Sequence, residues 1–139
     1  GALNAILSHD TYCFEPRFNS VTIFYDFTYK EMLIYRKPPK FYTEEEVHEA
    51  VENPAIIHFT TSFLSKRPWM KGCKHRYADE WMKYKKMSPW KDEPLREDNR
   101  PQWKQIGVKV LIRMPRKTAV RIAALMQVYG RPIINTLKR

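Results

Sequence analysis

One short stretch of the sequence brings together three side chains that could do chemistry. Residues 55–60 (Ala-Ile-Ile-His-Phe-Thr) have the composition of a buried strand, and His58 lies where that strand passes into a polar loop. Ligands of an open α/β sheet bind at the carboxyl ends of its strands, so the imidazole could ligate a metal ion or contact a phosphate. Lys66 and Arg67, about eight residues further on, could clamp a diphosphate from the same loop. The alternatives are a hydrogen-bonded core or loop histidine and a solvated pair of cations.

The aromatic residues that follow favour packing over binding. Trp69, directly after Pro68, could be a stacking platform, but core packing is the stronger interpretation. Tyr77, Trp81 and Tyr84 recur at the spacing of one helix face, and we expect this stripe to lie in the core.

The spacing of the other reactive side chains does not indicate a catalytic or metal site. Cys73 and His75 are two residues apart, so they do not share a helix face, and no third group completes a nucleophilic site. The acidic run Glu44–Glu46 is explained by helix capping. The sequence has neither a glycine-rich phosphate loop nor an Asp-x-Asp pair, and one histidine cannot hold a divalent ion tightly.

The elements that must position these residues alternate between strands and helices, which predicts an α/β protein. Residues 3–7 have the pattern of a helix end, and the β-branched and aromatic segments 21–27 and 31–36 are expected to be strands. The clearest helix runs from Thr43 to Val51, because Thr43 begins a capping box and Asn53-Pro54 stops the helix.

The second half of the chain is predicted to be helical with one irregular segment. The aromatic stripe indicates a helix that ends before Ser88-Pro89, and residues 89–101 are rich in proline and charge. Pro115 and Gly130 bracket another predicted helix.

The charge of the chain is concentrated at its C-terminal end. The 139 residues include 25 Lys/Arg and 15 Asp/Glu, for a net charge of +10. Residues 104–139 contain nine Lys/Arg and no acidic residue. These cations alternate with apolar residues from Trp103 to Ile112, the pattern of an interfacial anchor on anionic lipid. The alternative is a helix packed on the rest of the protein with a solvated basic face.

Composition excludes several classes of protein. A hydrophobic content of 43% excludes a disordered chain, and no apolar run is long enough to suggest a membrane span. Two cysteines, Cys13 and Cys73, are too few for a disulfide scaffold and fit no zinc-finger spacing, which favours a reducing cytosol.

Several motifs, taken in order, resemble the C-terminal part of glycosyltransferase family 8, which includes glycogenin and bacterial galactosyl- and glucosyltransferases of lipopolysaccharide and capsule synthesis. The resemblance covers residues 1 to about 95. It is carried by residues 53–60 (Asn-Pro-Ala-Ile-Ile-His-Phe-Thr), Arg67-Pro68-Trp69, Leu3-Asn4, Pro16-Arg17-Phe18-Asn19, the Tyr77/Trp81/Tyr84 helix and Ser88-Pro89-Trp90.

The resemblance implies a fold and a set of ligands. Residues 1–100 would be the C-terminal part of a GT-A, Rossmann-like domain, and residues 101–139 a basic amphipathic helical tail. The full-length enzyme would be a retaining transferase that moves a hexose from a UDP-sugar to a lipopolysaccharide, capsule or other glycan acceptor. His58 would ligate Mn²⁺ (or Mg²⁺), and Arg67 would bind the diphosphate, with Lys66 as the alternative.

The resemblance also implies partners and a location. The catalytic carboxylates would lie upstream of residue 1, so these residues alone would be inactive and the N-terminal part of the same enzyme would be a partner. A glycan or lipid-linked acceptor and an anionic membrane surface, the latter bound by residues 104–139, complete the expected partners. The protein would be cytoplasmic and peripheral at the inner face of a bacterial plasma membrane. The rival hypothesis is a nucleic-acid-binding module that uses the basic tail with Trp103 and other aromatic residues as stacking surfaces.

Overall fold

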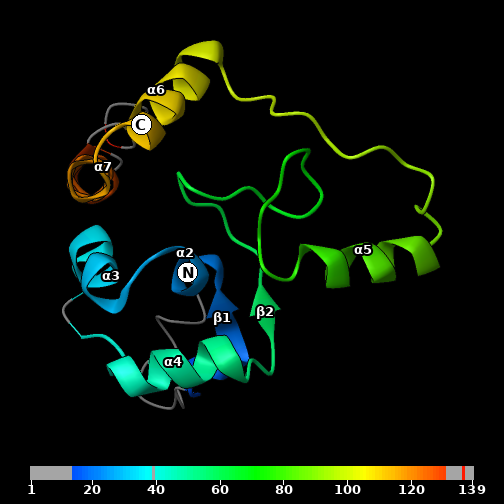
Figure 1. The fold of residues 1–139 in the computed structure, drawn as a ribbon, viewed down its shortest axis with the longest axis horizontal. Helices are drawn as coiled ribbons and strands as arrows, with labels where there is room; N and C mark the ends of the chain where they lie inside the picture. Colours follow the sequence, from blue (N-terminus) through cyan, green and yellow to red (C-terminus); the bar gives the residue numbers. More distant parts are fainter. Residues whose placement is uncertain (1–13, 39, 131–135, 137–139) are drawn as a thin grey trace.

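The computed structural model describes residues 14–38, 40–130 and 136. Its elements in chain order are η1 (a 3-10 turn, Pro16–Asn19), β1 (Ser20–Val21), α2 (Thr22–Asp26), α3 (Tyr29–Arg36), α4 (Glu44–Glu52), β2 (Ile57–His58), α5 (Ala78–Met87), α6 (Gln102–Arg113), α7 (Arg116–Leu125) and η2 (a π-helical turn, Met126–Gly130). In the view of Figure 1, α3, α6 and α7 lie on one side of the two strands and α5 lies on the other. The predicted helix end at residues 3–7 lies outside the described residues.

The only sheet in the described residues is a parallel pair formed by β1 and β2, with Ser20 opposite Ile57 and Val21 opposite His58. Parallel pairing across the intervening helices supports the α/β prediction in its coarse form, a mixed and mostly helical fold with a small parallel sheet. The predicted strand at residues 55–60 is confirmed only at Ile57–His58, and His58 is exposed there instead of buried.

The strands predicted at residues 21–27 and 31–36 are wrong, because both segments are mainly helical. Residues 22–26 form α2 and residues 29–36 form α3. Helix α3 begins at a capping box, in which the Thr28 hydroxyl accepts from the Glu31 amide at 3.3 Å and the Glu31 carboxylate accepts from the Thr28 amide at 2.9 Å. This satisfies two backbone donors at the helix start and outweighs the strand-like composition.

The helix predicted from Thr43 to Val51 is confirmed as α4. Thr43 and Glu46 form the expected capping box, with hydrogen bonds of 2.7 and 3.2 Å, and the helix ends before Asn53. The predictions of an irregular segment after Ser88 and of a helix that begins next to Pro115 are also confirmed.

A single hydrophobic core joins the first helices to the last. Helix α7 packs against α3 and shares the core with α2 and α4; the buried residues are Ile23, Phe24, Phe27, Met32, Tyr35, Val47, Ala50, Val120, Ala123 and Ala124. The Arg116 guanidinium at the start of α7 donates to both carboxylate oxygens of Glu31, at 2.7 and 2.8 Å. This bond lowers the pKa of Glu31 and ties the beginnings of the two helices together. The predicted division of the chain at residue 100 stays a prediction.

His75 is a buried, neutral histidine in a cluster of aromatic rings. Its side chain packs against Tyr25 and Phe59, each at 4.9 Å between ring centroids, and burial lowers its pKa from 6.5. The Tyr77 amide donates to Nδ1 at 3.2 Å, so the proton of the ring lies on Nε2, which is buried without a hydrogen-bond partner among the described residues.

We therefore expect acid to destabilise the protein through His75. A pKa lower in the folded than in the unfolded state means that the unfolded chain binds more protons, so this contribution is complete above pH 6.5 and is lost as the pH falls below it. Urea denaturation at pH 7.0 and pH 5.5 measures the loss. His75→Asn, which keeps an acceptor for the Tyr77 amide, should have a smaller difference between the two pH values; an equal difference would show that His75 does not cause it.

Candidate functional site

A pocket of about 430 Å³ lies at the carboxyl end of β2. Its wall includes Asn19, His58, Arg67 and Trp69 together with residues 56–59. Two of the three predicted site residues, His58 and Arg67, therefore line one pocket, and Lys66 does not. None of the described residues that line it is acidic, so the Arg67 guanidinium gives this wall a positive charge.

Strand pairing and one side-chain hydrogen bond position His58. The parallel pairing of β1 and β2 brings the residue next to η1, and His58 Nδ1 lies 3.0 Å from Asn19 Oδ1. Because an amide oxygen only accepts, Nδ1 carries the proton. Asn19 therefore fixes the tautomer and leaves Nε2 as the second ring atom able to contact a ligand.

Arg67 is the one permanently charged side chain among the described residues that line the pocket. Its guanidinium lies 5.3 Å from the centroid of the Trp69 ring, which orients it. It forms no salt bridge with any carboxylate in the described part of the chain. Its Nε is buried and has no hydrogen-bond partner among the same residues. A buried donor without a partner costs about 1–3 kcal/mol.

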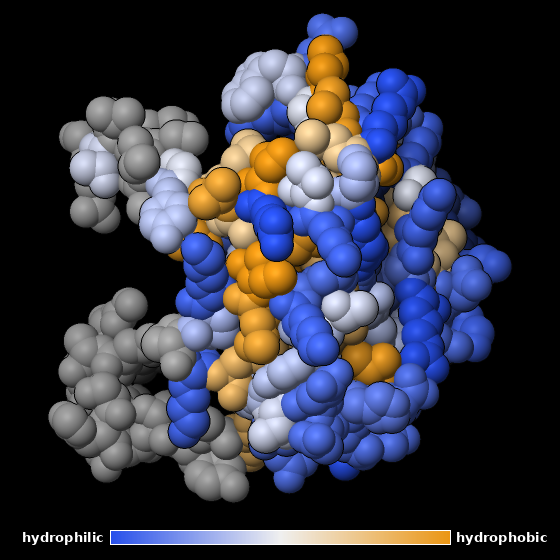
Figure 2. Space-filling model, turned by 60° about the vertical axis from the view of Figure 1, so that its left-hand side comes forward, coloured by the Kyte–Doolittle hydropathy of each residue, from blue (hydrophilic) through white to orange (hydrophobic). Residues whose placement is uncertain are grey.

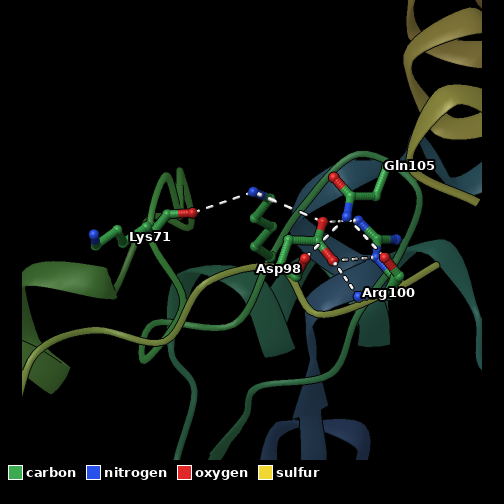
Figure 3. A network of polar contacts seen from close by, with 5 residues as sticks. Lys71, Asp98, Arg100 and Gln105 are labelled. Atoms are coloured by element: carbon green, nitrogen blue, oxygen red, sulfur yellow. Dashed lines mark hydrogen bonds and ion pairs between the residues drawn. The ribbon is translucent and has the colours of Figure 1, made fainter. Parts of the chain in front are cut away.

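Lys66 is engaged elsewhere, in a network around Asp98. Figure 3 shows this network, with Lys71, Asp98, Arg100 and Gln105 labelled. Lys66 Nζ donates to the Lys71 carbonyl at 3.2 Å and lies 4.0 Å from the Asp98 carboxylate. Arg100 also binds Asp98 and lowers the pKa of its carboxyl to about 2, so Asp98 stays ionised. The structure thus favours Arg67 over Lys66 as the cation of the pocket.

Backbone pairing holds the loop that carries Arg67. Pro68 is fully buried, and the Trp69 carbonyl accepts from the Arg96 amide at 2.8 Å. The Lys71 amide donates to the Arg96 carbonyl at 2.9 Å, which completes the parallel bridge between Met70 and Arg96. The irregular segment 89–101 therefore supports the pocket loop from one side.

The first part of the same loop is held by Asp26. Its carboxylate accepts hydrogen bonds of 2.5 Å from the hydroxyls of Ser62 and Ser65. The Thr60 amide donates to the Thr22 hydroxyl at 2.9 Å. These bonds connect the loop to α2 and fix the path between His58 and Arg67.

A second groove, of about 570 Å³, adjoins the pocket and shares Arg67 and Trp69 with it. We call it the aromatic groove; the residues of its wall that matter here are Trp69, Trp81, Tyr84, Trp90, Glu93 and Arg96. Lys85 Nζ shapes it by donating to the carbonyls of Trp90, Lys91 and Glu93 at 2.7–2.8 Å, which ties the segment after α5 back onto that helix.

The prediction that the aromatic stripe lies in the core is wrong for Trp81 and Tyr84, whereas Tyr77 packs against Tyr25 with their ring centroids 5.7 Å apart. Helix α5 has no buried residue, and Tyr84 is 72% exposed. Trp69 and Trp81 are only half-buried, with their rings 6.1 Å apart, and both face the aromatic groove. Helical spacing shows that residues share a face, but it does not distinguish a face that packs on the core from one that lines a groove.

The described residues do not by themselves provide a metal site. No group of three or more His, Cys, Asp or Glu side chains that could hold a metal ion occurs among them. Of the described residues in the wall of the pocket, His58 is the one with such a side chain. The predicted Mn²⁺ (or Mg²⁺) stays a prediction.

Comparisons with known proteins give one relative. Residues of this chain are 35% identical to general stress protein A of Bacillus subtilis (strain 168) over 89 residues, which is 64% of this chain and 28% of the relative. The match thus spans little more than a quarter of the relative's length. No protein-family model matches the chain. No solved structure matches it.

These comparisons contradict the resemblance to glycosyltransferase family 8. They return no glycosyltransferase family, and the relative is named for a general stress protein. The predicted hexosyl transfer, and the role in lipopolysaccharide or capsule synthesis that came with it, are therefore withdrawn. The comparisons show that the chain is similar to general stress protein A over 64% of its length.

Proposed function

We propose that the protein binds the diphosphate group of a nucleotide in the pocket between His58 and Arg67. The observation that carries this proposal is the buried Arg67 Nε, a charged donor without a partner among the described residues. A guanidinium donates two parallel hydrogen bonds to phosphate oxygens, and His58 adds a donor or acceptor on the other wall.

The aromatic groove supports a nucleotide over inorganic phosphate as the ligand. Two residues, Arg67 and Trp69, line both the groove and the pocket. Tyr84 and Trp90 are exposed by 72% and 61%, and their faces could stack on a flat ring. A diphosphate held at Arg67 would leave the organic part of its ester beside these rings.

A titration that compares pyrophosphate with UDP tests this proposal. Stacking of a base on an aromatic side chain contributes about 1–3 kcal/mol, so we expect UDP to bind about 5- to 150-fold more tightly than pyrophosphate. Tyr84→Ala and Trp90→Ala should bring the dissociation constant of UDP close to that of pyrophosphate without changing the latter. Met87→Ala, an exposed residue of α5 outside the groove, is the matched control.

Two outcomes of this titration would contradict the proposal at different points. If calorimetry detects no binding of pyrophosphate, the pocket is not a diphosphate site. If pyrophosphate and UDP bind equally well in every variant, the aromatic groove does not take part.

The remaining expectations stay predictions. They are the UDP-sugar donor, the glycan acceptor, the N-terminal partner, enzymatic activity and a larger Rossmann-like sheet. The cytoplasmic, membrane-peripheral location also stays a prediction. No helix in the described part of the chain is long and apolar enough to cross a bilayer.

A further inference from the structure

Helix α6 exposes an apolar face that the rest of the described chain does not cover. Trp103, Ile106 and Val110 are exposed by 66%, 53% and 52%, and none of the twelve residues of the helix is buried. Their spacing places them on one face of the helix. A Cβ added at Gly107, between them, would meet no atom within 4 Å, so this face is open.

The other side of α6 fixes the helix to the protein. Leu111 packs against the hydrophobic core, and α6 contacts α7. At the start of the helix, the Gln105 amide group donates to the carbonyls of Asp98 and Arg100 at 2.9 and 2.7 Å. The open face is therefore held in a defined orientation on the surface.

Positive charge surrounds this open face. Lys104, Lys109 and Arg113 lie on α6, and none of them forms a salt bridge with a carboxylate in the described part of the chain. By contrast, Arg116 of α7 is bound to Glu31 and belongs to the fold. Figure 2, with the side that carries α3, α6 and α7 turned forward, shows apolar side chains beside strongly hydrophilic ones.

We propose that this face of α6 binds the surface of an anionic lipid bilayer. An apolar strip flanked by lysine and arginine, with a tryptophan at its end, suits the boundary between headgroups and acyl chains. Charge complementarity favours an anionic lipid surface over a neutral one as the partner. Residues 104–139 contain nine basic and no acidic residues, and an anionic surface attracts each cation near it. The helix would lie in the plane of the interface, with Trp103, Ile106 and Val110 inserted.

Flotation with lipid vesicles tests the proposal. The whole chain should float with vesicles that contain 30 mol% phosphatidylserine in phosphatidylcholine and remain unbound with phosphatidylcholine alone. Lys104→Glu combined with Lys109→Glu should weaken the partition coefficient at least about tenfold, because each surface cation is replaced by a repelled anion. Lys86→Glu, an exposed lysine of α5, makes the same type of change away from α6 and should weaken binding much less.

A second pair of variants separates insertion from simple charge attraction. Ile106→Gln and Val110→Gln keep the net charge and alter exposed side chains, so the fold should be unchanged by circular dichroism. Both should reduce vesicle binding about fivefold or more, whereas Met87→Gln, 82% exposed on α5, should not.

Three results would overturn the proposal. The first is equal binding to neutral and anionic vesicles, and the second is full binding by Ile106→Gln and Val110→Gln. The third is binding of DNA or RNA at 200 mM salt without any vesicle binding, which would identify nucleic acid as the partner of this surface.

Discussion

Met32→Ala should lower the free energy of unfolding by about 2–5 kcal/mol, the cost of deleting a large side chain from a close-packed core. Met32 is 1% exposed and lies on α3, the helix that packs against α7. The substitution therefore leaves a cavity in the core that joins the first and last helices. Urea denaturation followed by circular dichroism measures the change.

Met87→Ala is the matched control for this prediction. It makes the same chemical change at a methionine that is 82% exposed, where the expected effect is within about 0.5 kcal/mol. If the two variants lose the same stability, the core described around α3 and α7 is wrong.

Capping boxes explain where sequence reasoning about the fold succeeded and where it failed. The pattern Thr43-x-x-Glu46 precedes a helical stripe, and both the prediction and the structure begin a helix there. The same pattern occurs at Thr28-x-x-Glu31, but the β-branched and aromatic composition around it favoured strands. The side chains of Met32 and Tyr35, three residues apart, share the buried face of α3, and this tertiary packing overrides strand propensity.

The site was predictable to the extent that it depends on local sequence. His58 and Arg67 were identified because a strand end and a short loop keep them close, and both line the pocket. Asn19 and His58 are 39 residues apart in sequence, and the parallel pairing of β1 and β2 brings them together. Local sequence therefore gave no sign of their contact. The aromatic groove was missed because its rings have the spacing of a core-facing stripe.

Arg67→Ala should weaken pyrophosphate binding at least about 100-fold. Each hydrogen bond to a charged group contributes about 1.5–3 kcal/mol, and the guanidinium can make two to a diphosphate. Arg67→Lys should lose less, because it keeps the charge but not the planar fork. Isothermal titration calorimetry gives the dissociation constant for each variant.

Lys66→Ala is the control that makes this result specific. It removes the neighbouring cation, which lies outside the pocket and beside Asp98, so the affinity for pyrophosphate should be unchanged. If Lys66→Ala weakens binding as much as Arg67→Ala, the positive charge of the loop is responsible instead of the pocket geometry.

Anion binding at Arg67 can be tested by observing the Arg67 Nε–H group by ¹H–¹⁵N NMR during a titration with pyrophosphate. This donor is buried without a partner among the described residues, and its resonance reports on an anion bound to the same guanidinium. We predict a saturable shift of the Arg67 Nε–H resonance, accompanied by shifts of the Asn19 side-chain amide and the His58 ring. An Arg67 resonance that does not move while pyrophosphate binds elsewhere on the protein would contradict the account.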